Sequence, residues 1–215
     1  MNFIIAVDGP AASGKGTVAG QLAAELGLPY LDTGLLYRAV GVEAASRDGA
    51  LAAAAIAAAR ELAPSALENP ELRTRGAGEL ASQVAVIPEV RAALLDFQRA
   101  FAAQAGGAVL DGRDIGTVIA PHAPAKLFVT AAPETRAERR WKQLTGQGET
   151  VTLEEVLADI RLRDERDSSR ASAPLVQAAD AVLLDTTKMS ISEAADAARR
   201  IVQACLLYTS DAADE

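Results

Sequence analysis

The sequence is poor in several features that would define other classes of protein. Cys205 is its only cysteine, so an intrachain disulfide is impossible. No apolar run approaches the roughly 18 residues that a membrane-spanning helix needs. Residues 1–8 are short and carry no basic region, which excludes a signal peptide and predicts a strand instead. A cytosolic location is the default expectation.

The sequence also lacks an excess of positive charge. Its 29 acidic residues outnumber its 21 basic residues and leave a formal net charge of −8, which argues against general nucleic-acid binding. If the substrates are polyanions, the cationic groups must therefore be concentrated locally. The 215 residues, half of them hydrophobic, suffice for one sizeable core with small appendages, and we expect a monomer.

Short apolar runs alternate with helical patterns along the chain. Strands are expected at residues 3–7, 30–31, 108–110, 126–130 and 181–184. Such alternation predicts parallel βαβ units, and hence an α/β fold of three layers with a five-stranded parallel sheet. The core is expected at 1–32, 105–140 and 171–204. An almost entirely helical insertion at 33–104, with helices at 69–85 and 88–104, and a charged segment at 141–170 interrupt it.

The last eleven residues, CLLYTSDAADE (205–215), do not continue the pattern before them. Residues 192–204 have the spacing of an amphipathic helix, which we expect to end at 204. The eleven residues resemble the translation of a sequencing adapter, so we expect a single domain over 1–204 followed by a non-native tail. A genuine disordered acidic tail is the alternative.

A glycine-rich loop follows the first predicted strand. Its sequence, GPAASGKGT, has the spacing of a P-loop, in which backbone N–H groups, a helix N-terminus and a lysine bind phosphates. Gly16 stands where the strict motif has Ser or Thr, and the hydroxyl comes one residue later. That variant is typical of nucleoside monophosphate kinases. We expect these residues to bind ATP: Gly9, Pro10, Ala11, Ala12, Ser13, Gly14, Lys15, Gly16 and Thr17.

Four further motifs accompany the loop: LDTGLLYRA (31–39), LRTRGAGELASQVAVIPEVR (72–91), DGRDIGTVIAP (111–121) and RLRDERDSSRASAPL (161–175). With them the chain resembles the bacterial cytidylate kinases over residues 1–204. The resemblance implies a P-loop kinase fold and transfer of the γ-phosphoryl group of ATP to CMP or dCMP. It also implies that 33–104 is the part that binds the nucleoside monophosphate and that 141–170 is an arginine-rich lid.

An acceptor nucleotide needs cations for its phosphate and hydrogen-bonding groups for its base. A carboxylate can accept from the cytosine amino group, and an arginine can donate to N3 and O2. The resemblance gives these roles to Asp114 and Arg91, the phosphate to Arg38 and Arg113, and the sugar to Arg163 and Asp167. Without it, Arg38 could lie on a solvated helix face and Arg113 in a loop ion pair. The CMP contacts implied by the resemblance are Thr33, Tyr37, Arg38, Ser82, Arg91, Arg113, Asp114, Arg163 and Asp167.

Arginines of the charged segment recur at helical spacing, with Arg163, Arg166, Asp167 and Arg170 at i, i+3, i+4 and i+7. A solvated, salt-bridged helix pair is the alternative to a phosphate-binding lid. By resemblance the catalytic groups are Lys15, Arg139, Arg166 and Arg170, which would neutralise charge on the transferred group. A Mg²⁺ ion is expected to bridge the donor phosphates near Thr17 and Asp111, which would contact it directly or through water.

One departure and two competing functions remain at this point. Many relatives have a longer segment with a small β insert where this chain has only residues 64–71, so its acceptor part is shorter and mostly helical. Another P-loop kinase, of UMP/CMP or shikimate type, is the first alternative. A P-loop nucleotide switch is the second, and it would have no pocket for a second nucleotide. No membrane or nucleic-acid partner is expected.

Overall fold

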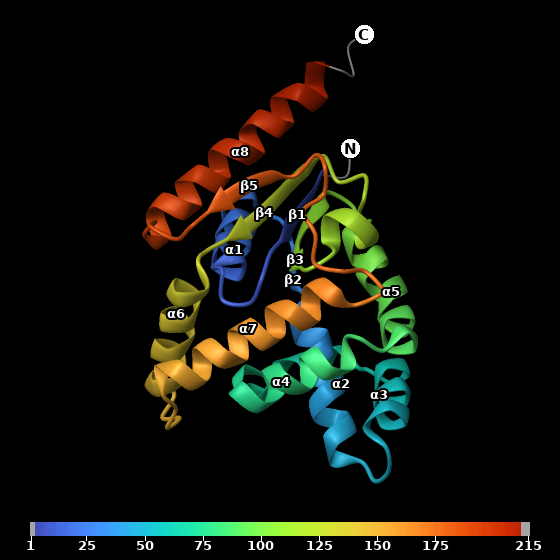
Figure 1. Cartoon of the computed structure of the whole chain (residues 1–215). Helices are drawn as coiled ribbons and strands as arrows, with labels where there is room; N and C mark the ends of the chain where they lie inside the picture. The colour runs from blue at the N-terminus through green and yellow to red at the C-terminus, as the bar shows by residue number, and fades with distance from the viewer. Residues whose placement is uncertain (1–2, 212–215) are drawn as a thin grey trace.

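The computed structural model describes residues 3–211 and has a five-stranded parallel sheet at its centre (Figure 1). The strand order is β2-β3-β1-β4-β5. The strands are β1 (Phe3–Asp8), β2 (Tyr30–Asp32), β3 (Gly107–Gly112), β4 (Ala125–Thr130) and β5 (Val182–Asp185). The α/β class and the parallel sheet predicted from the alternating pattern are confirmed.

Alternate residues of β1 point to opposite faces of the sheet and belong to two different hydrophobic cores. Ile5 and Val7 pack with α1 (Lys15–Leu26) and α8 (Ile191–Asp211), whereas Ala6 packs with the helices of the insertion. Helices therefore cover both faces, as a parallel sheet requires, and Figure 1 shows the three layers. No described helix is both long and apolar enough to cross a bilayer.

The insertion between β2 and β3 consists only of helical segments. They are α2 (Thr33–Ser46), α3 (Leu51–Arg60), η1 (Pro64–Glu68), η2 (Pro70–Arg73), α4 (Arg75–Val84) and α5 (Pro88–Ala102). The expectation of one helix over 69–85 was wrong, because the chain breaks at Thr74. Its extended backbone ends η2, and its hydroxyl caps α4 by accepting from the Ala77 N–H at 3.2 Å.

The charged segment forms a helical pair, α6 (Pro133–Gly146) and α7 (Leu153–Ser169), around a small core of its own. Thr152 and Glu155 form a reciprocal capping box at the start of α7. In Figure 1, α7 (orange) crosses in front of the sheet's carboxyl edge and lies beside α4 (green), which it contacts. Helix α7 and the insertion thus meet over that edge.

The end of the closing helix differs from the sequence expectation. Helix α8 does not stop at residue 204 but continues to Asp211, and half-buried Cys205 packs against the same core as the rest of the helix. The prediction of a helix end at 204 was therefore wrong. Residues 212–215 of the expected tail lie outside the described part of the chain.

Two helical glycines provide a test of this packing. A Cβ on Gly41 of α2 would lie 2.8 Å from Leu80 Cβ and 2.9 Å from its carbonyl carbon, in the close contact between α2 and α4. Gly41→Ala is therefore expected to lower the free energy of unfolding by about 1–3 kcal/mol. Chemical denaturation measures the change.

The matched control is Gly20→Ala in α1, where a Cβ would meet nothing within 4 Å. It is expected to raise the free energy of unfolding by about 0.5–1 kcal/mol because alanine restricts the unfolded chain. Equal effects of the two substitutions would contradict the close α2–α4 contact.

Candidate active site

The phosphate loop connects the carboxyl end of β1 to the first turn of α1. Gly9 has φ 152°, and a Cβ there would lie 2.0 Å from the Val129 carbonyl oxygen, so only glycine fits against β4. Gly14, which precedes α1, has φ 91°, and Ala12 has φ 58°. These left-handed positions turn the chain sharply and bring the positive end of α1 to the carboxyl edge of the sheet.

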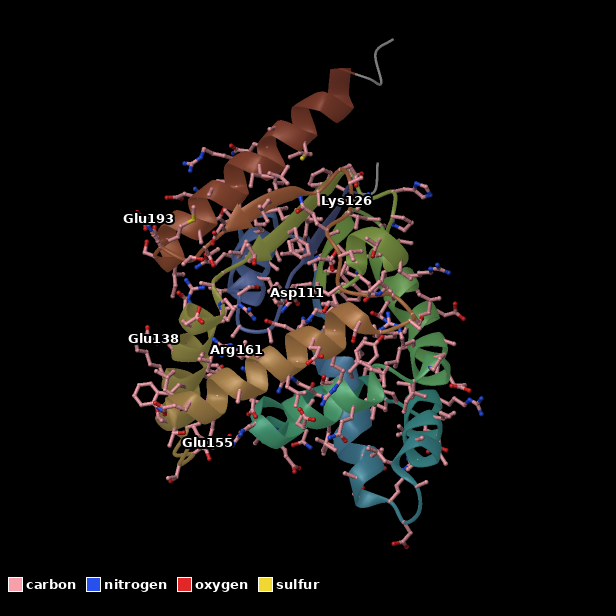
Figure 2. All side chains as sticks on the ribbon, in the orientation of Figure 1. Asp111, Lys126, Glu138, Glu155, Arg161 and Glu193 are labelled. Atoms are coloured by element: carbon pink, nitrogen blue, oxygen red, sulfur yellow. The ribbon has the colours of Figure 1, made fainter. Side chains whose placement is uncertain are left out.

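Lys15 and Asp111 face one another at this edge. Lys15 Nζ lies 3.9 Å from Asp111 Oδ2, and the Tyr30 hydroxyl donates to Asp111 Oδ1 at 3.1 Å. A Cβ on Gly16 would lie 3.4 Å from Asp111 Oδ2 and 3.5 Å from the Tyr30 oxygen. The glycine at the strict motif's hydroxyl position thus leaves room beside the carboxylate. Figure 2 shows Asp111 near the middle of the molecule, at the edge that α7 crosses.

Burial opposes both charges of this pair. It raises the pKa of Asp111 to about 7, with a contribution from the nearby Asp32 carboxylate, and lowers the pKa of Lys15 to about 8, with a contribution from Arg113. Protein Mg²⁺ sites commonly use one or two carboxylates and leave the other positions to substrate phosphates and water. Asp111 facing the phosphate loop, with no group of three acidic, His or Cys ligands among the described residues, fits that kind of site.

A cavity of about 400 Å³ opens beside the phosphate loop. Its walls come from the loop, from α6 and from the segment that joins β5 to α8. Ala12, Gly14, Thr17 and Arg139, which the sequence predicted, line it. Sequence reasoning missed its remaining walls, which are Val18, Arg140, Gln143, Thr186, Met189, Ser190, Ile191 and Ala194.

Thr186 fixes Arg139 against the phosphate loop. Arg139 donates from Nη1 to the Thr186 hydroxyl oxygen at 2.9 Å and from Nη2 to its carbonyl at 2.7 Å. The Thr186 hydroxyl donates in turn to the Ser13 carbonyl at 2.8 Å. One arginine of α6 is thereby held in the cavity wall by protein groups alone.

A second, much smaller pocket lies between the insertion and α7. Its volume is about 40 Å³, room for about three water molecules. This space is much smaller than the few hundred Å³ of a typical small-molecule site. Eight of the nine residues predicted to contact the acceptor line this pocket: Thr33, Tyr37, Ser82, Arg91, Arg113, Asp114, Arg163 and Asp167.

The ninth, Arg38, lies next to the pocket. It donates to the Leu72 carbonyl at 2.7 Å, and its guanidinium converges with that of Arg163 over Gly78, where a Cβ would lie 3.4 Å from Arg38 Nη2 and 3.6 Å from Arg163 Nη1. Arg38 is thus neither on a solvated helix face nor bound to a carboxylate within the described residues.

The two predicted base-reading side chains meet at the inner end of the small pocket. Arg91 and Asp114 form a buried ion pair, and the Arg91 guanidinium lies 5.7 Å from the centre of the Tyr37 ring. Arg170 approaches from the other side, with Nη2 3.7 Å from Asp114 Oδ1. Burial raises the pKa of Asp114 in spite of these cations. A carboxylate and guanidiniums thus face the pocket together.

The arginines nearer the pocket entrance are only partly balanced. Arg113 donates to Asp167 at 2.8 Å, and Arg113 with Arg163 lowers the pKa of Asp167 although burial opposes them. Burial, then the charge of Arg113, lowers the pKa of Arg163 to about 9, and its buried Nε has no hydrogen-bond partner. Burial, then Arg140, lowers the pKa of Arg38 to about 10. An anion placed among these groups would relieve their repulsion.

The arginines predicted to form a lid divide between several contacts. Arg166 donates to Glu79 at 3.0 Å and to Ser82 at 2.9 Å, and Arg170 lines the small pocket. Both therefore lie in or beside the small pocket, and their role as phosphate ligands stays a prediction. Arg136 is bidentate to Asp164 and ties α6 to α7, so this arginine has the salt-bridged role that the alternative interpretation described.

Comparison with known proteins decides the family. The family model described as cytidylate kinase matches residues 5–204. The chain belongs to the cytidylate kinase family. A relative named cytidylate kinase from Caulobacter sp. (strain K31) is 69% identical, with 94% of this chain and 95% of the relative covered. One of the same name from Xanthobacter autotrophicus (strain ATCC BAA-1158 / Py2) is 64% identical, with 94% and 98% covered.

Solved structures support the fold alone. An uncharacterized protein from Eubacterium ventriosum ATCC 27560 has a TM-score of 0.55 at 16% identity, covering 94% of this chain and 99% of the other. A Thermus thermophilus protein has a TM-score of 0.50 at 24% identity, covering 94% and 97%. The assignment of this chain to the cytidylate kinase family therefore rests on sequence, and the five-stranded P-loop architecture agrees with it.

The lowered pKa of Lys15 predicts that phosphate binding is linked to protonation in this member of the cytidylate kinase family. At pH 8.5 a lysine with a pKa of about 8 is mostly neutral, and a bound polyphosphate would raise that pKa. ATP binding should then take up as much as about 0.7 of a proton. Titration calorimetry in buffers of different ionisation enthalpy measures the uptake.

Lys15→Arg is the control, because a guanidinium stays protonated at this pH. The variant should lose most of the uptake while keeping a cation at the loop. Undiminished uptake in Lys15→Arg would show that Lys15 is not the group that titrates.

Proposed function

We propose that this protein transfers the γ-phosphoryl group of ATP to CMP or dCMP, giving ADP and CDP or dCDP. The observation that carries the proposal is the second pocket, in which the buried Arg91–Asp114 pair lies among arginines and which shares no lining residue with the cavity beside the phosphate loop. A one-nucleotide switch has no use for such a pocket. The names of the relatives at up to 69% identity support the same acceptor.

The chemistry needs alignment and charge neutralisation more than covalent help from the protein. The attacking oxygen belongs to a phosphate that is already ionised at neutral pH, so no general base is needed. Lys15 and Arg139 lie beside the donor cavity, and Arg113 and Arg163 line the acceptor pocket. Cations on both sides of the transferred group would stabilise its charge in the transition state.

A Mg²⁺ ion would bind with ATP, and Thr17 and Asp111 are the residues that would hold it, directly or through water. The ion would neutralise charge on the donor phosphates. Asp111 must be deprotonated to hold the ion, and with a pKa of about 7 its carboxyl group ionises within the physiological pH range. The lid arginines Arg166 and Arg170 are proposed to turn toward phosphates when both nucleotides are present.

Selection of the base rests on the polarity of the group at C4. In cytosine this group is an amino group, from which the Asp114 carboxylate can accept a hydrogen bond, while Arg91 donates to N3 and O2. Uracil presents a carbonyl oxygen at C4, which would face the carboxylate without a hydrogen bond. Such a mismatch costs about 1–3 kcal/mol, and we therefore expect CMP to be preferred over UMP. Ser82 is proposed to assist Asp114 and Arg91 in binding the base, and Thr33 and Tyr37 line the same pocket.

An assay of ADP release with ATP, Mg²⁺ and each nucleoside monophosphate in turn tests the function. CMP and dCMP should be the best acceptors, and Asp114→Asn should reduce the ratio of kcat/KM for CMP to that for UMP by about 10-fold or more. Asp196→Asn on α8 is the matched control, since it neutralises an exposed carboxylate that pairs with Arg199.

Equal ADP release with every acceptor would favour the nucleotide switch, and an unchanged ratio in Asp114→Asn would remove Asp114 from base selection. The monomeric state and the cytosolic location stay predictions, which sedimentation and cell fractionation measure.

A further inference from the structure

The proposed mechanism makes no use of one buried carboxylate at the carboxyl edge of the sheet. Asp8 is the last residue of β1, directly before Gly9 of the phosphate loop, and its residue exposure is 5%. Its Oδ1 accepts from the Ile115 N–H at 2.8 Å, and its Oδ2 accepts from the Gly116 N–H at 2.7 Å. These amides belong to the turn that follows Arg113 and Asp114.

That turn has an uncommon form that leaves amides in need of acceptors. It is a single π-helical turn, η3 (Ile115–Ile119), closed by bonds from the Ile119 N–H to the Asp114 carbonyl and from the Ala120 N–H to the Ile115 carbonyl. The first N–H groups of any helical turn lack partners within it. A preceding Asp side chain usually supplies one.

Asp114 occupies the capping position of η3 but does not cap it. Its side chain makes no capping bond, and its carboxylate instead pairs with Arg91 in the acceptor pocket. Asp8 supplies the missing acceptors from the neighbouring strand. The carboxylate that faces the acceptor pocket is thereby free of the local bonds that an Asp before a helical turn would otherwise make.

The contact is close on both sides. Asp8 pairs with Gly112 in the β1–β3 register, so Arg113 and Asp114 lie between that pairing and the two capped amides. A Cβ on Gly116 would lie 3.3 Å from Asp8 Oδ2 and 3.2 Å from Lys126 Cδ. Any side chain at Gly116 would therefore push against the carboxylate.

The charge of Asp8 is retained at a cost in stability. Burial raises its pKa to about 6, although both amide bonds oppose the shift, and none of the described cations forms an ion pair with it. When folding raises the pKa of an acid, ionising that acid costs more free energy in the folded state than in the unfolded state. The free energy of unfolding therefore falls as the pH rises from the unfolded-state pKa to the folded-state pKa. A neutral residue would avoid this cost.

We propose that Asp8 is a positioning residue for the acceptor site, which fixes Arg113 and Asp114 by capping the turn behind them. The inference rests on the proposed function, since the acceptor is the nucleotide that these two residues would contact. Asp8 also connects the proposed donor and acceptor sites. Its backbone leads directly into the phosphate loop, and its side chain holds the turn that follows the acceptor residues.

Asp8→Asn tests the proposal, because the amide offers one oxygen acceptor and sets its NH₂ group against the second N–H. The KM for CMP should rise about 10-fold and the preference for CMP over UMP should fall about 10-fold, whereas the KM for ATP should change less than about 3-fold. Gly116→Ala disturbs the same contact from its other partner and should shift the same constants in the same direction.

Val202→Ala in α8 is the control, since it opens a cavity in the core without touching either pocket. It should lower stability and leave the CMP/UMP ratio unchanged. The proposal is overturned if Asp8→Asn keeps the CMP constants within about 2-fold of the wild type, or if Val202→Ala changes the ratio as much as Asp8→Asn does.

Hydrogen exchange separates this proposal from the proposed function. If the wild type phosphorylates no nucleoside monophosphate, the proposed function fails, and exchange still tests the contact. In Asp8→Asn the amides of Ile115 and Gly116 should exchange about 10-fold faster or more, with β1 amides such as that of Ala6 unchanged. Unaltered exchange at Ile115 and Gly116 would overturn the proposal even in an active enzyme.

Discussion

Burial of positive charge at the carboxyl edge of the sheet is the constraint on which the rest of the site depends. Lys15, Arg38 and Arg163 all have lowered pKa values because they are desolvated, and Arg113 adds repulsion to each of them. The fold brings them together from the phosphate loop, the insertion, the turn after β3 and α7. A chain with a net charge of −8 thereby presents a local excess of cations where polyanions are to bind.

The acidic residues make this arrangement possible. Asp111 faces Lys15, Asp167 pairs with Arg113, and Asp114 pairs with Arg91, each from within the same edge. They balance only part of the positive charge, because the Arg163 Nε still lacks a partner. Removing either member of a buried pair leaves the other charged and desolvated, so these residues cannot be altered independently. An acidic protein can therefore still bind anionic substrates at this edge of the sheet.

The alternating pattern predicted the sheet, the glycine-rich motif predicted the phosphate loop, and the family resemblance named nine acceptor contacts, eight of which line one pocket. They did not predict the cavity wall around Thr186 and Met189, because that segment has no periodicity or motif to mark it, and its position depends on where β5 ends. The orientation of Arg166 toward Glu79 was missed because helical spacing gives a face but not a partner. The capping role of Asp8 depends on pairing between distant strands.

The break at Thr74 and the extension of α8 show a different limit. A threonine after a short helix is compatible with either continuation or a new cap, and the choice depends on how α4 packs against α2. At residue 205 the pattern weakens, yet the helix continues where Cys205 still reaches the core. Local sequence preferences are small enough that packing decides such boundaries.

The ion pairs between α7 and α4 have a consequence for how firmly the small pocket is held together. Arg166–Glu79 and Arg75–Asp159 bridge α7 and α4, and three of these four side chains are more than a third exposed. Exposed pairs of this kind contribute little and are screened by salt, whereas the Arg113–Asp167 pair, which ties α7 to the turn after β3, is largely buried. Salt should therefore weaken the attachment of α7 to the insertion more than its attachment to the sheet.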